Sequence, residues 1–153
     1  MTSAAPAAST IAKGILKDVV APTALQPGYI VFTLPGTSYQ IHLRPQGDIR
    51  SAPGQRIKGS IRCQARRVDR SGTGGRFVEP VFGRPRRLQG TVIGHDTSAN
   101  AIIIDAGGST VPGFDGGLPI TCVLSDARQK PGDFQVGDLV GFDVFEGATF
   151  TQA

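Results

Sequence analysis

Basic side chains gather in the middle of the chain, and they are its most informative chemical feature. Residues 56–87 hold ten Lys/Arg against two Asp/Glu, a net charge of +8, whereas residues 88–153 hold two against eight, a net charge of −6. Residues 1–55 add a net charge of +2. A polyanion is attracted to such a basic cluster, and the attraction weakens steeply with salt. The charge layout therefore indicates a negatively charged partner, either a nucleic acid or the acidic surface of a protein.

Catalytic and metal-binding patterns are missing from the sequence. It contains no Gly-x-Ser-x-Gly, no His-Glu-x-x-His and no phosphate loop ending in Gly-Lys-Ser/Thr. His42 and His95 stand alone, and neither Cys63 nor Cys122 has a second ligand at a spacing that zinc would use. We therefore predict no enzymatic activity, no catalytic residues, no cofactor and no metal.

Two sites leave an alternative open. The glycine-rich stretch 105–117 carries two carboxylates but lacks the alternating oxygen ligands of a calcium loop, so a long hairpin explains its glycines more simply than a ligand site does. Cys63 and Cys122 fall in strand-like runs at unrelated positions. We interpret them as small buried hydrophobes in a reducing compartment, with a disulfide as the alternative.

The composition predicts an all-β protein rich in turns. The 21 Gly and 11 Pro residues interrupt any long helix, while 39% hydrophobic residues suffice for a core. No apolar run approaches the roughly 18 residues that a transmembrane helix needs. Residues 1–12 lack the basic start and apolar stretch of a signal peptide, and we expect them to form a flexible tail. We expect a soluble, cytoplasmic protein without membrane contact.

Runs rich in β-branched and aromatic residues, separated by Gly and Pro, predict two sets of five strands. The first set is residues 13–20, 28–34, 38–43, 55–68 and 76–82, and the second is residues 86–95, 101–105, 118–124, 138–145 and 148–152.

The two sets resemble each other in order and pattern, which predicts an internal duplication. Gly14-Ile15-Leu16 matches Gly90-Thr91-Val92, Ile30-Val31-Phe32 matches Ile102-Ile103-Ile104, residues 39–43 match 118–122, and the Gly-x-x-β-x-x-x-β pattern of 54–61 matches 137–144. We therefore expect two tandem antiparallel barrel-like modules, a basic one at 13–83 and an acidic one at 84–153.

Five short strands with an irregular connection between the third and fourth resemble an OB-fold-like barrel. The phrases at 53–57 and 136–144 are also similar to the Gly-turn-strand entry of cold-shock and related small barrels. The resemblance implies an outer face that often holds single-stranded nucleic acid. Residues 44–54 and 125–136 are short and contain Pro, so they leave room for at most a single helical turn there.

Strand alternation predicts which side chains face outward. In residues 55–63 the apolar set points inward, and Arg56, Lys58 and Arg62 point outward. With the basic residues that follow and the outward Tyr29, these define the predicted single-stranded nucleic-acid site of the first module: Arg56, Lys58, Arg62, Arg66, Arg67, Arg70, Arg76 and Tyr29. Phe77 and Phe82 are the other aromatic residues that could stack on bases.

The alternative function is a structural or assembly module that binds a protein partner or a second copy of itself. The repeat alignment places apolar Leu139 and Phe145 at outward positions, where the first module has Arg56 and Arg62. Such residues are poor solvent-facing choices, so we expect the other module or a second chain to cover them. If the register is wrong by one residue, both side chains point inward instead.

Overall fold

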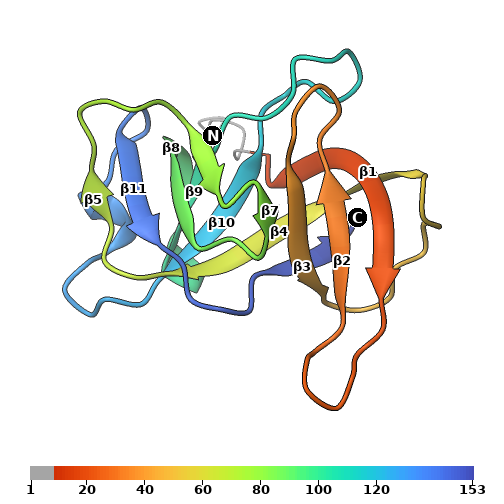
Figure 1. The fold of residues 1–153 in the computed structure, drawn as a ribbon. Helices are drawn as coiled ribbons and strands as arrows, with labels where there is room; N and C mark the ends of the chain where they lie inside the picture. Colours follow the sequence, from red (N-terminus) through yellow and green to blue (C-terminus); the bar gives the residue numbers. More distant parts are fainter. Residues whose placement is uncertain (1–8) are drawn as a thin grey trace, which may run out of the picture.

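The computed structural model describes residues 9–153 (Figure 1). Within these residues the hydrogen-bonded strands form one twelve-stranded sheet. The all-β class predicted from the sequence is therefore confirmed. Within these residues no helix has the length and apolar character to cross a membrane. Most of the predicted tail, residues 1–8, lies outside the described residues. Ile11 and Ala12 are not part of a tail, because they open β1 and pair with Ser60 and Gly59.

The strands lie close to the predicted runs. They are β1 (Ile11–Val20), β2 (Tyr29–Thr33), β3 (Gln40–Pro45), β4 (Arg56–Ala65), β5 (Asp69–Arg70), β6 (Phe77–Glu79), β7 (Phe82–Gly83), β8 (Arg87–Asp96), β9 (Ala101–Asp105), β10 (Pro119–Leu124), β11 (Leu139–Asp143) and β12 (Thr149–Gln152). The predicted strand at 76–82 divides into β6 and β7, with Pro80, which has no N–H for a strand ladder, between them. Two single 3-10 turns, η1 (Thr97–Ala99) and η2 (Pro131–Asp133), are the helical elements of residues 9–153.

A closed five-stranded barrel forms from β1, β2, β3, β12 and β4, with β4 pairing back to β1. The neighbours β3 and β12 run parallel, and the other neighbouring strands of the barrel run antiparallel. This arrangement is consistent with an OB-like barrel. The fifth strand of the barrel comes from the other end of the chain, because β12 is the last strand in sequence (Figure 1).

The long strand β4 also belongs to the rest of the sheet. Its second half, Ile61 to Ala65, pairs in parallel with β10, and β9, β8 and β11 follow in that order. A single bridge between Ala65 and Val144 brings the chain after β11 back to β4. The module boundary between residues 83 and 84 stays a prediction, and β12 crosses it by completing the barrel that β1 to β4 begin.

Glycines allow two strand pairs to approach closely at the matched positions of the proposed repeat. A Cβ at Gly14 would lie 2.5 Å from the carbonyl oxygen of Thr33, and a Cβ at Gly90 would lie 2.6 Å from that of Asp105. Each pair, β1 with β2 and β8 with β9, shifts register a few residues later. The duplication itself stays a prediction.

The core follows the predicted alternation. Ile57, Ile61 and Cys63 of β4 are buried while Arg56 and Arg62 between and beside them are exposed. In the middle of the barrel, the rings of Phe32 and Phe150 are fully buried with their centroids 5.5 Å apart. Strand β12 therefore contributes directly to the core. It also holds β3 and β4 on either side of it, so that the three strands share one outer face.

Candidate nucleic-acid interface

A hollow of about 630 Å³ opens on the outer face of β2 and β3, between the β1–β2 loop and the β11–β12 loop. We call it the β2–β3 groove. Its lining combines aromatic, basic and exposed apolar side chains: Leu25, Gln26, Pro27, Tyr29, His42, Arg44, Arg84, Arg86, Glu146, Gly147 and Ala148.

Three rings form an aromatic platform in and beside the groove. Tyr29 stacks on His42 with ring centroids 4.5 Å apart and an angle of 18° between the planes, and Phe82 meets His42 edge-on at 5.0 Å. Phe82 is 63% exposed although it is a large apolar side chain. Such an arrangement leaves a ring face or edge available for a planar ligand.

Burial keeps the middle ring of this platform uncharged. Desolvation lowers the pKa of His42 below its ordinary value, so the imidazole is neutral at pH 7. Its Nε2 atom is buried and has no hydrogen-bond partner within the described part of the chain. The stack of Tyr29 and His42 is thus a neutral aromatic surface between charged neighbours.

The local sequence explains how these side chains reach one place. Tyr29 and His42 occupy outward positions of β2 and β3, which alternate with the buried Ile30 and Leu43. Phe82 joins them because β7 pairs in parallel with β3, with Phe82 opposite Gln40.

Positive charge surrounds the platform. Arg44 of β3 and Arg84 and Arg86 after β7 all line the groove, against one carboxylate, Glu146, among its described lining residues. The Oε1 atom of Glu146 lies 4.0 Å from Nη2 of Arg44 and 3.7 Å from Nε of Arg84. With His42 neutral, the lining carries a net charge of +2.

The sheet register extends this surface from the groove to β4. Thr149 of β12 is paired with Arg44 of β3 on one side and with Arg62 of β4 on the other. Paired residues point to the same face, so the two arginines lie two strand spacings apart, roughly 10 Å. Arg62 is exposed, and among residues 9–153 no carboxylate oxygen lies within 4.0 Å of its guanidinium. Tyr29 and Arg62, two of the predicted site residues, therefore border one continuous surface.

The remaining predicted residues of β4 lie further along its outer face. The guanidinium of Arg56 lies 4.8 Å from the ring centre of Phe114, and Lys58 is directly opposite Lys13 of β1. They line a smaller hollow of about 300 Å³ with the end of β12. These two residues do not reach the aromatic platform.

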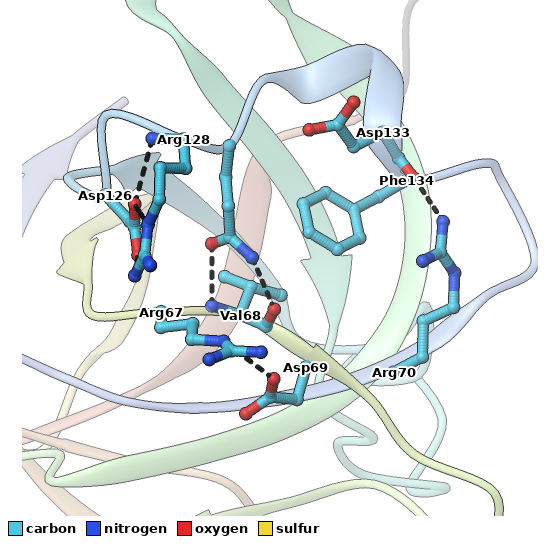
Figure 2. A pocket seen from close by; sticks show the side chains of 9 residues that line it. Arg67, Val68, Asp69, Arg70, Asp126, Arg128, Asp133 and Phe134 are labelled. Atoms are coloured by element: carbon cyan, nitrogen blue, oxygen red, sulfur yellow. Dashed lines mark hydrogen bonds and ion pairs between the residues drawn. The ribbon is translucent and has the colours of Figure 1, made fainter.

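Four further predicted residues lie apart from the groove. Arg66 covers the ring of Phe145 at 4.0 Å, and Arg76 forms a 2.8 Å ion pair with Asp105. Arg67 and Arg70 line a separate hollow of about 560 Å³ (Figure 2). The cluster of basic residues that is continuous in sequence is thus divided among several surfaces.

Two of the arginines that line the hollow in Figure 2 form ion pairs with carboxylates of the same hollow. Arg67 pairs with Asp69 at 3.2 Å, and Arg128 pairs with Asp126 at 2.9 Å. Hydrogen bonds from Arg128 lower the pKa of Asp126 to about 2. Each arginine is therefore already engaged, and the hollow offers little net attraction to a polyanion.

Arg70, the third arginine there, is engaged as well. Its Nε atom lies 3.3 Å from Oδ2 of Asp138. It also donates a hydrogen bond to the carbonyl of Asp133, and its guanidinium stands 5.4 Å from the ring centre of Phe134 (Figure 2). The Gln129 side chain accepts a hydrogen bond from the N–H of Val68 and donates one to its carbonyl. These two bonds satisfy backbone groups that lie outside the sheet.

The predicted interface residues are partly covered within the chain. Leu139 and Phe145 are half-buried, while Val140 and Phe142 between them point into the core. The predicted register of β11 is therefore correct, and the one-residue shift is not. A contact of Leu139 or Phe145 with a second chain stays a prediction.

The glycine-rich stretch 105–117 is a hairpin connection, as the simpler interpretation held. The Asp105 carboxylate accepts hydrogen bonds from the N–H groups of Gly107 and Leu118, both at 2.9 Å, and so closes the loop between β9 and β10. In the described part of the chain, no three His, Cys, Asp or Glu side chains gather in a way that could hold a metal ion.

The cysteines are neighbours, contrary to the view that their positions are unrelated. Cys63 of β4 and Cys122 of β10 are register partners, both buried, with their sulfur atoms 3.7 Å apart. Burial raises the pKa of Cys122 well above its ordinary value, with a further increase from the adjacent Cys63 thiol. The two cysteines are neighbours because β4 and β10 pair in parallel. No local sequence pattern predicts that these two strands are adjacent.

Sequence reasoning missed most of the groove. The sequence shows His42 as a lone histidine and does not predict that it joins an aromatic stack, and the roles of Arg44, Arg84 and Glu146 depend on the positions of β7 and β12. Comparison with protein-family models, with curated proteins and with solved structures finds no match for this chain. The geometry of the groove is therefore the basis for a functional proposal.

Proposed function

We propose that this protein is a non-enzymatic, single-stranded nucleic-acid-binding protein whose site runs from the β2–β3 groove across β12 to β4. The observation that carries the proposal is the aromatic platform of Tyr29, His42 and Phe82 set beside Arg44, Arg84 and Arg86. Unpaired bases stack on such rings while arginines bind the phosphates between them.

A single strand suits this surface better than a duplex. Bases in a duplex are already stacked on one another, whereas a single strand can offer a base face to Phe82 and to the Tyr29–His42 pair. Stacking on an aromatic side chain contributes about 1–3 kcal/mol per base and tolerates any base, so we expect little sequence preference.

The phosphate backbone would follow the basic positions from the groove toward β4. Arg44 and Arg62 flank Thr149 on the outer face, which supplies two fixed cations and a hydroxyl along one line. In OB-like barrels the same region, the outer face of strands two and three with its adjoining loops, holds oligonucleotides or oligosaccharides. The fold resemblance supports the proposal, and the arginines favour the charged ligand.

Phe82→Ala is the sharpest test, because that ring is exposed and its removal leaves the core intact. We expect the affinity for a twelve-nucleotide oligo-dT, measured by fluorescence anisotropy at low salt, to fall roughly 5- to 150-fold, which is one lost stacking contact. Val136→Ala is the matched control: Val136 is 64% exposed, against 63% for Phe82, and lies outside the groove lining. Failure of the unmodified protein to bind at low salt, or an equal loss in both variants, contradicts the proposal.

The second candidate, an assembly module, draws on the opposite charges of the middle and the end of the chain. Four ion pairs join an arginine of residues 56–87 to a carboxylate of residues 88–153: Arg70–Asp138, Arg76–Asp105, Arg84–Glu146 and Arg87–Asp143. These charges are engaged within one chain, which leaves less of them for a neighbour. We therefore place nucleic-acid binding first.

A further inference from the structure

One carboxylate occupies the most basic part of the β2–β3 groove. The same oxygen of Glu146, Oε1, lies 3.7 Å from Arg84 Nε and 4.0 Å from Arg44 Nη2, so a single negatively charged atom is shared between two guanidinium groups. A phosphate oxygen between two arginines makes the same kind of contact. Glu146 thus marks where an anion fits in the groove.

The contact is loose enough to be exchanged. The side chain of Glu146 is 66% exposed, and both ion pairs are longer than a charge-assisted hydrogen bond. Glu146 lies on the β11–β12 loop, where Gly147 has a φ of +108°, a conformation that L-residues rarely adopt. The loop turns at Gly147 and carries Glu146 to the rim of the groove, from which it can swing into solvent.

We infer that Glu146 is a built-in competitor for the phosphate position between Arg44 and Arg84. The inference rests on the proposed function, because it identifies the residue that sets affinity and salt dependence at that site. When a single-stranded ligand binds, one of its phosphates displaces the Glu146 carboxylate, which moves into solvent. The exchange replaces one anion with another, so it releases fewer counterions than binding to two free arginines.

This exchange gives Glu146→Gln an unusual signature, a gain in binding instead of a loss. Without the competing charge, Arg44 and Arg84 are available to the ligand from the start. An exposed ion pair is worth up to about 1 kcal/mol, so affinity for oligo-dT should rise about two- to fivefold at low salt. Because the Glu146 carboxylate no longer offsets one unit of the positive charge that meets the ligand, the slope of log K against log salt should also steepen, by up to about 0.7.

Asp69→Asn is the matched control. Asp69 also pairs with an arginine, Arg67, its side chain has the same 66% exposure, and the substitution removes one negative charge in the same way. It lies in the hollow of Figure 2, outside the groove. Any gain that comes only from the change in net charge therefore appears in both variants.

The experiment measures anisotropy of labelled twelve-nucleotide oligo-dT at several salt concentrations for the unmodified protein, E146Q and D69N. A gain in affinity and a steeper slope in E146Q alone support the inference. Equal affinities and slopes in all three proteins, or an equal gain in both variants, overturn it while leaving the proposed function intact. Binding by E146Q alone supports the competitor role and overturns the proposed function for the native chain, and binding by none of the three overturns both.

Discussion

Phe150→Ala tests whether the last strand of the chain closes the barrel. Phe150 is fully buried, and its ring lies 5.5 Å from that of Phe32, within the range of favourable aromatic pairs. It also packs against the backbone of β4, because a Cβ at Gly59 would come within 2.6 Å of the Phe150 ring. Strand β12 pairs with β4 over all four of its residues and with β3 at two positions, and the buried Phe150 side chain is what anchors it in the core.

The magnitude follows from burial. Removing a fully buried phenylalanine ring costs about 3–5 kcal/mol, and the lost aromatic pair places Phe150 in the middle or upper part of that range. Small domains have unfolding free energies of about 5–15 kcal/mol, so the variant should fold with much reduced stability.

Urea denaturation followed by tyrosine fluorescence or circular dichroism measures the loss. Phe82→Ala serves as the control, because Phe82 is 63% exposed and should change the free energy of unfolding by less than about 0.5 kcal/mol. A decrease in the free energy of unfolding of less than about 1 kcal/mol for Phe150→Ala refutes the reasoning, since removing a side chain from the centre of a closed barrel leaves a cavity that costs more than this.

Two further predictions concern ionisable groups away from the groove. The thiols of Cys63 and Cys122 should resist a thiol reagent in the native protein, because both are buried and burial raises the pKa of Cys122. Both thiols should react after unfolding. Rapid labelling of the native protein contradicts this placement. Asp126 should titrate at about pH 2 in carbon-detected NMR and return toward its ordinary pKa of 3.8 in Arg128→Gln. Since folding lowers the pKa of Asp126, any stability that the ion pair adds is present above pH 3.8 and fades as the pH falls toward 2. An unchanged titration of Asp126 in the variant excludes Arg128 as the cause of the lowered pKa.

The strands were predictable because their signals are local. Alternation of apolar and polar residues and punctuation by Gly and Pro act over a few residues, which is the range that a single sequence displays. They gave the inward and outward faces of β4, including exposed Arg56 and Arg62, and the register of β11. The same patterns do not encode which strands become neighbours.

The site was harder to predict because it depends on those neighbours. β12 inserts between β3 and β4, which places Thr149 between Arg44 and Arg62, and β7 brings Phe82 to His42. All of these contacts join segments far apart in sequence. The contiguous run of basic residues suggested one patch, but its strand, turns and ion pairs direct the side chains to different surfaces.

Amide chemical-shift mapping with single-stranded oligo-dT tests the central claim most directly. With an isotope-labelled, otherwise unmodified chain at low salt, we predict that the largest shifts fall on Tyr29, His42, Arg44, Thr149 and Arg62, a continuous path over β2, β3, β12 and β4. An unchanged spectrum, or shifts confined to the hollow around Arg67 and Arg128, would show that the groove is not a nucleic-acid site.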